Sequence, residues 1–175
     1  YPIREEGPYS VNARLALPDR ALTSSKLFFD VVPGLAILSL TAGTRDPAEG
    51  VRKYSLVSVS REMHQYIFLR ILDEERKKCF GTYELGQFLH YFKPVLLLDG
   101  EAQVHVLHQS GPNQFVHSTF TPNGRPVQHS VYRGDMSRMR LEKAPNGHVA
   151  VFGGKLVSPD DDDEPEPRPA PLPRR

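Results

Sequence analysis

The sequence predicts an all-β protein, most directly a β-sandwich of about ten to twelve short antiparallel strands. Apolar and polar residues alternate in several segments, at the period of a half-buried strand. Segments such as Tyr66–Leu72 are rich in aromatic and β-branched residues. Turn sequences such as Asp99-Gly100 and Asn123-Gly124 separate these segments at short intervals.

Four strands are expected in the first 60 residues. The segment 11–17 alternates, and Pro18-Asp19 ends it; the apolar segment 26–32 is closed by Pro33-Gly34. A loop composition in 42–50 separates the last two of these strands. The four expected strands are 11–17, 26–32, 35–40 and 54–59.

The stretch 61–78 supports two interpretations. Met63, Tyr66, Ile67 and Ile71 would share one face of a helix. The composition of Tyr66–Leu72 favours a strand instead. We favour the strand, followed by a charged turn and a further strand at Cys79–Leu85.

The region 95–132 is interpreted as an antiparallel meander whose strands cover 95–98, 103–109, 114–120 and 127–132. With Asn123-Gly124 as a two-residue turn, Ser118 faces His129. With a four-residue loop at 110–113, His105 faces Ser118. This register predicts that His105 and His129 share one sheet face, and that His108 and His117 share the other.

A weak internal repeat supports an alternative fold. Ala102–Leu107 is similar to Gly147–Phe152, and both segments place alternating valines after a turn. A spacing near this length is typical of one four-stranded propeller blade. The alternative is therefore a partial propeller-like stack of meanders. Residues 1–157 form the β-rich body, and a division into two units would fall near 90–94.

Residues 158–175 form a separate tail. It carries six acidic residues and three arginines, and a proline stands at every second position from 165 to 173. Such a chain is extended and cannot bury a core, so we expect a disordered spacer or chain end.

The charges of the body are spread rather than clustered, which gives no reason to expect a nucleic-acid partner. No apolar run approaches the ~18 residues of a membrane helix, so membrane insertion is not expected either.

The histidine content is the one unusual feature of the composition, with seven histidines in the chain and four of them in the meander. Each face of the trial register holds two, fewer than the three or four ligands that zinc requires. We therefore predict no metal site and no cofactor, and treat the four meander histidines as polar strand residues and only weak metal candidates: His105, His129, His108 and His117. A Ser118–His129 dyad lacks an orienting acid and an oxyanion hole nearby. No catalytic residue is predicted, and the chain is not expected to be an enzyme.

Aromatic residues gather at Phe88–Phe92, directly before Pro94. The simpler interpretation is a core-filling segment. The alternative is an exposed recognition patch formed by Phe88, Tyr91 and Phe92. Cys79, the only cysteine, is expected to be a small buried apolar residue.

Several segments resemble known β-proteins. Gln103–Gln109 and Phe120–Gly124 resemble the glycine-punctuated, short-strand repeats of extracellular β-proteins. Phe28–Gly34 resembles the opening hairpins of Ig-like modules in bacterial envelope proteins. The resemblance implies an exported bacterial β-protein with Ig-like or propeller-blade-like repeats. It carries no functional motif and supplies no site residue.

We therefore expect a non-catalytic binding or structural module of an exported protein, acting through its sheet surface on a protein or a glycan. Its location would be periplasmic or extracellular, and the cytoplasm stays open. One alternative is a carbohydrate-binding, lectin-like module, against which the absence of tryptophan argues. The other is a metal-dependent or hydrolytic enzyme that uses the meander histidines.

Overall fold

The computed structural model describes residues 7–32, 34–73 and 75–158. These ranges contain fifteen β-strands, a three-residue 3-10 turn at Pro47–Glu49 and no α-helix, so the all-β prediction is confirmed. Within them, no helix is long and apolar enough to cross a membrane. Except for Ser158, the predicted tail lies outside the described residues.

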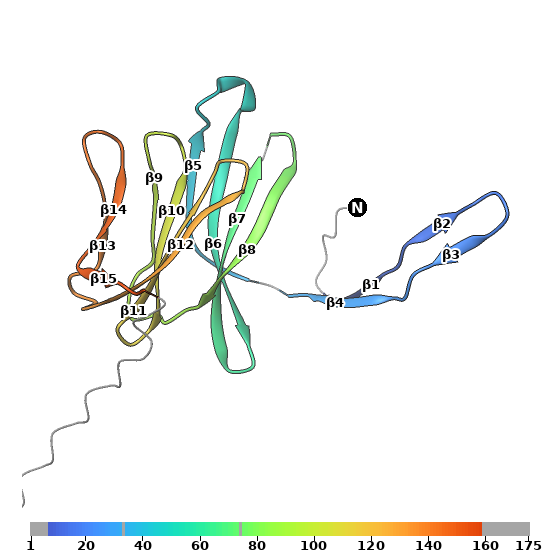
Figure 1. The fold of residues 1–175 in the computed structure, drawn as a ribbon, viewed down its shortest axis with the longest axis horizontal. Helices are drawn as coiled ribbons and strands as arrows, with labels where there is room; N and C mark the ends of the chain where they lie inside the picture. The colour runs from blue at the N-terminus through green and yellow to red at the C-terminus, as the bar shows by residue number, and fades with distance from the viewer. Residues whose placement is uncertain (1–6, 33, 74, 159–175) are drawn as a thin grey trace, which may run out of the picture.

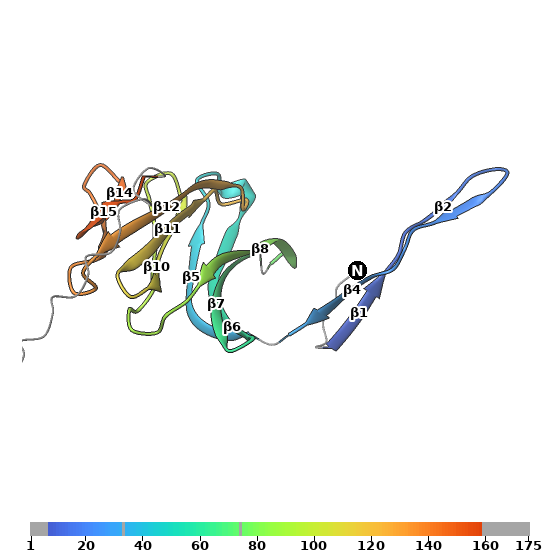
Figure 2. The same cartoon turned by 60° about the horizontal axis from the view of Figure 1, so that its bottom comes forward.

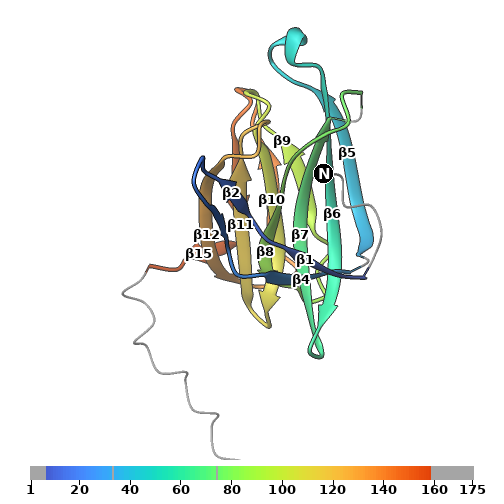
Figure 3. The same ribbon diagram turned by 90° about the vertical axis from the view of Figure 1, so that its right-hand side faces the viewer.

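Two antiparallel sheets pack face to face (Figures 1 and 3). The first sheet contains, in order, β5 (Leu35–Gly43), β6 (Val51–Arg61), β7 (His64–Asp73) and β8 (Lys78–Gln87). The second contains, in order, β15 (Gly154–Leu156), β12 (Pro126–Gly134), β11 (Gln114–Phe120), β10 (Val104–Gly111) and β9 (Val95–Leu98). The strand interpretation of the stretch 61–78 is therefore confirmed.

The main core lies between the two sheets. Alternate residues of β6 and β7, such as Leu56 and Leu69, are fully buried against Val104 and Val106 of β10. Burying such side chains contributes about 1.5–3 kcal/mol each, which is the main force that holds the sheets together. The segment 88–94 runs from one sheet to the other, and Phe88 packs in this shared core.

In the two sheets of the sandwich, consecutive strands pair, except that β15 pairs with β12. Ig domains place strands in a different order, because Greek-key connections switch between their sheets. The sandwich packing is therefore combined with the connectivity of two successive meanders, the pairing pattern of the propeller-like alternative.

A hairpin covers part of the outer face of the five-stranded sheet. It consists of β13 (Arg140–Lys143) and β14 (Val149–Phe152). Leu141 of the hairpin packs with Met139 against Leu107 and Phe115 of the sheet, forming a second apolar cluster. Side chains on both faces of β10 and β11 are buried as a result.

The trial register of the meander is half right. Ser118 pairs with His129, as predicted. His105, however, pairs with Thr119 rather than Ser118, because a bulge between Gln109 and Gly111 shortens the turn. A slip of one residue moves every side chain to the other face. His105 and His117 therefore share the outer face, which corrects their predicted separation.

Residues 7–32 form a two-stranded ribbon that projects from the sandwich (Figures 1 and 2). It pairs β1 (Gly7–Val11) with β4 (Leu27–Val31), and β2 (Arg14–Ala16) with β3 (Ala21–Thr23). The predicted single strand at 11–17 is thus split in two. None of its described residues belongs to either core cluster, and Leu27 and Phe28 are 65% and 73% exposed.

Candidate functional site

A polar cavity of about 470 Å³ lies on the outer face of the five-stranded sheet, beside the β13–β14 hairpin. It is built from four separate segments: the β9–β10 turn, the β13–β14 turn, strands β11 and β12, and the loop after β5. Its polar lining consists of Arg45, Asp99, Glu101, Gln103, His105, Thr119, Gln128, Asn146 and His148.

Two glycines join the turns that form the walls of this cavity. The Gly100 amide donates a hydrogen bond to the Gly147 carbonyl over 2.9 Å. A Cβ atom on Gly147 would lie 3.0 Å from the Gly100 Cα, and Gly147 has a φ of +87°. Both the close approach and the left-handed backbone favour glycine.

Asp99 organises the β9–β10 turn. Its Oδ1 accepts hydrogen bonds from the backbone amides of Glu101 and Gln103, each over 2.8 Å. This local bonding is the usual role of an aspartate in a turn. Its Oδ2 is thereby directed toward the sheet, where it lies 3.3 Å from His105 Nε2.

The floor of the cavity is a hydrogen-bonded group on β10 and β11. His105 Nδ1 lies 3.0 Å from His117 Nε2 and 3.2 Å from the Thr119 hydroxyl. All three side chains are buried, and Thr119 is only 2% exposed. Asp99, His105 and His117 thus form a chain in which the His105 ring is the central link.

Burial keeps both rings neutral at physiological pH. Burial is the main cause that lowers the pKa of His105, and the Asp99 carboxylate opposes part of this effect. Burial, followed by repulsion from His105, lowers the pKa of His117 to about 4. The neutral rings serve as hydrogen-bond donors and acceptors rather than as charges.

The same geometry does not gather metal ligands. Asp99 and His117 contact opposite nitrogens of the His105 ring, so the three groups do not converge on one point. Among the residues that the structure describes, no group of three or more His, Cys, Asp or Glu side chains could hold a metal ion.

The other two candidate histidines lie toward the inner face. The Ser118 hydroxyl lies 3.1 Å from His129 Nδ1, so the two residues of the Ser118–His129 dyad are within hydrogen-bond distance. Ser118 is only 1% exposed, however, so its hydroxyl is not accessible to a substrate. His108 is fully buried, and neither ring nitrogen makes a hydrogen bond of ordinary geometry. Burial lowers its pKa to about 4, although the nearby Gln87 carbonyl opposes the shift.

The aromatic candidates are scattered. Phe88 is 3% exposed and belongs to the main core. Phe92 is 9% exposed and packs edge-on against Phe115. Only Tyr91, at 80% exposure, presents a ring to solvent, so the three do not form a surface patch. Cys79 is exposed, contrary to the expected burial, because it lies on the outer side of edge strand β8.

Several residues of the site were not predicted from the sequence. Asp99 was noted only as a turn residue, and Glu101, Thr119, Gln128 and Asn146 were not singled out. A signal for Asp99 was present, because antiparallel pairing of β9 with β10 places the turn that joins them next to His105. Comparison of the chain with known protein families, with curated proteins and with solved structures found no match to any of them.

Proposed function

We propose that this protein is a non-catalytic binding module whose polar cavity binds a small, neutral, hydroxyl-rich ligand of the carbohydrate class. The carrying observation is the convergence of hydrogen-bonding side chains from four separate segments on one cavity of about 470 Å³. Ligand sites typically have volumes of roughly 300–1,000 Å³.

The chemistry of the lining favours a neutral polar ligand. Arg45 opposes the two carboxylates Asp99 and Glu101, and the imidazole at the floor is uncharged. Gln103, Gln128 and Asn146 add amide groups, each of which both donates and accepts hydrogen bonds. Neighbouring hydroxyls of a sugar offer the matching set of donors and acceptors.

The absence of tryptophan remains an argument against a lectin that stacks sugars on aromatic rings. The proposed mode does not need such a platform, because the cavity would hold its ligand by hydrogen bonds. Val127 and Val149 supply the apolar contact. An exported location, periplasmic or extracellular, is part of the proposal because it would expose the cavity to free glycans.

A hydrolase is the second candidate, because Asp99, His105 and Thr119 are arranged as acid, imidazole and hydroxyl. The His105 ring lies 3.3 Å from the Asp99 carboxylate and 3.2 Å from the Thr119 hydroxyl. The burial of the Thr119 hydroxyl argues against it, and His117 competes for the same His105 nitrogen. Turnover of p-nitrophenyl esters or glycosides that is abolished by Thr119→Val would favour this candidate over the binding module.

The proposal is tested by titrating the isotope-labelled protein with monosaccharides and disaccharides, and following amide NMR shifts. We expect saturable shifts at Gly100, Gln128 and Gly147 with at least one sugar. A Gln128→Ala/Asn146→Ala variant should lose this binding by at least tenfold. A Gln87→Ala/Asn113→Ala variant removes the same side-chain types from exposed positions outside the cavity and should bind normally. Absence of shifts with every sugar, or equal losses in both variants, would contradict the proposal.

A further inference from the structure

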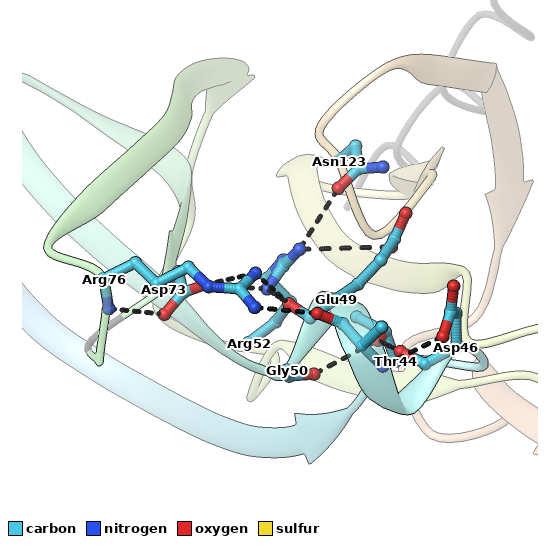
Figure 4. A network of polar contacts seen from close by, with 9 residues as sticks. Thr44, Asp46, Glu49, Gly50, Arg52, Asp73, Arg76 and Asn123 are labelled. Atoms are coloured by element: carbon cyan, nitrogen blue, oxygen red, sulfur yellow. Dashed lines mark hydrogen bonds and ion pairs between the residues drawn. The ribbon is translucent and has the colours of Figure 1, made fainter.

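A second cavity of about 470 Å³ lies where three turns meet at one end of the sandwich. Figure 4 shows the polar contacts among several residues that line it. The β5–β6 connection, the β7–β8 turn and the β11–β12 turn enclose it, together with the first residues of β8. Its lining consists of Glu49, Arg52, Asp73, Arg76, Lys78, Phe80, Asn123 and Arg125.

A buried ion pair forms the base of this cavity. The Arg52 guanidinium is 2% exposed and donates to Asp73 Oδ2 over 3.1 Å and to the Glu49 carbonyl over 2.6 Å. Asp73 also accepts a hydrogen bond from the Arg76 backbone amide over 2.9 Å. Both oxygens of the Asp73 carboxylate are therefore engaged within the protein.

The cavity has more positive than negative charge. Four of its side chains are basic and two are acidic. Arg76 is held by the carbonyls of Ala48 and Glu49 over 2.7 and 2.9 Å. Lys78 and Arg125, in contrast, make no ion pair within the part of the chain that the structure describes. These two charges are available to a ligand.

Neighbouring groups position donors around the same space. The Lys78 ammonium lies 4.5 Å from the centre of the Phe80 ring, which also stacks under Arg52. Asn123 Oδ1 accepts from Arg52 over 3.4 Å, so the amide NH₂ points away from this guanidinium (Figure 4). An ammonium, a guanidinium and an amide thus approach the cavity from β8 and from the β11–β12 turn.

We propose that this cavity binds a tetrahedral oxyanion, phosphate or sulfate, held by Lys78, Arg125 and the amide of Asn123. Charge-assisted hydrogen bonds from such groups are the usual means by which proteins hold phosphate. Arg52 and Asp73 act as positioning residues, because they orient Asn123 and tie the turns together. The oxyanion is either the free ion or the terminal ester of a larger molecule. This site is separate from the sugar cavity and does not depend on it.

The test is calorimetry on the full chain at low ionic strength with inorganic phosphate, sulfate and glucose 6-phosphate. We expect at least one to bind with a Kd below about 1 mM, and 0.5 M NaCl to weaken it because salt screens exposed charges. Tighter binding of glucose 6-phosphate than of phosphate would identify an ester as the ligand. Equal binding would identify the free ion.

A Lys78→Gln/Arg125→Gln variant should bind the oxyanion at least tenfold more weakly. The matched control, Lys93→Gln/Arg138→Gln, removes the same two charges from exposed positions outside this cavity and should bind normally. Thermal unfolding of both variants checks that each is folded. No binding of any of the three probes, or an equal loss in the control, would overturn the proposal.

Discussion

His105 Nδ1 lies 3.0 Å from His117 Nε2, and the two rings stack with their centroids 5.2 Å apart. One ring must donate and the other accept, so at least one histidine of the pair is neutral. This contact links the floor of the polar cavity to the packing of the sheet and makes both sensitive to acid.

We predict that the protein loses stability as the pH falls from 6.5 to 4. The folded-state pKa of His117 is about 4 against 6.5 when unfolded, so the unfolded chain binds more protons in this window. The stabilisation is complete above pH 6.5, and its loss through His117 amounts to about 3 kcal/mol. Urea unfolding at pH 7, 6, 5 and 4 measures it. His117→Leu should flatten the dependence, whereas the exposed His64→Leu should not; equal slopes in both variants would contradict this assignment.

Replacing His108 by leucine should stabilise the protein. The ring of His108 is fully buried, and its contact with the Gln87 backbone falls short of a hydrogen bond of ordinary geometry, so the native state carries the cost of a poorly satisfied polar group. Removing it should add about 1 kcal/mol at pH 7. The gain should grow at pH 5, because burial also lowers the pKa of His108 to about 4. Destabilisation by His108→Leu at both pH values would show that the ring has a partner in solution.

The register of the meander shows what local sequence can and cannot predict. The predicted two-residue turn at Asn123-Gly124 placed Ser118 opposite His129 correctly, but next to the turn Phe120 pairs with Pro126, and a bulge between Thr119 and Phe120 restores the expected register. Between β10 and β11, a loop of four residues and a tighter turn with a bulge at Ser110 were both compatible with Ser110–Asn113. The choice depends on which residues the second apolar cluster buries, and this is a tertiary effect.

The candidate site depended on that same choice. With His117 on the outer face, the pair with His105 forms, and Asp99 completes the chain. The walls of the cavity further require Gly100 to meet Gly147, a contact between turns far apart in the sequence. Alternation predicts the strands, but it does not show which turns meet at one end of a sheet.

Asp73→Asn should destabilise the protein by about 3 kcal/mol, because it leaves the buried Arg52 guanidinium with the half-exposed Glu49 carboxylate, 4.0 Å away, in place of its buried counter-charge. The matched control is Glu84→Gln, which breaks the exposed pair with Arg61. That change should cost less than about 1 kcal/mol. Chemical denaturation at pH 7 compares the two. A loss near 1 kcal/mol for Asp73→Asn would mean that water reaches Arg52.

Met63→Gly should stabilise the protein by about 1 kcal/mol. Glu62 and Met63 form the β6–β7 turn with φ values of 48° and 66°, a left-handed conformation that glycine adopts more readily. The Met63 side chain is fully exposed, so no packing is lost. Thermal unfolding of Met63→Gly and Met63→Ala separates relief of backbone strain from loss of the side chain, because alanine removes the side chain beyond Cβ but keeps the strained backbone. Equal melting temperatures would contradict this interpretation.

Deleting residues 1–33 should leave the sandwich folded. None of the described residues of this segment contributes to either core cluster, and its paired strands contact chiefly each other. The free energy of unfolding should therefore change by no more than about 1 kcal/mol, with cooperativity retained. Denaturation curves followed by circular dichroism measure both.

The deletion also removes exposed apolar side chains such as Leu27 and Phe28, so self-association at high concentration should decrease. Loss of cooperative unfolding would instead mean that the ribbon folds back onto the sheets, because only packing against the core could make the body depend on it.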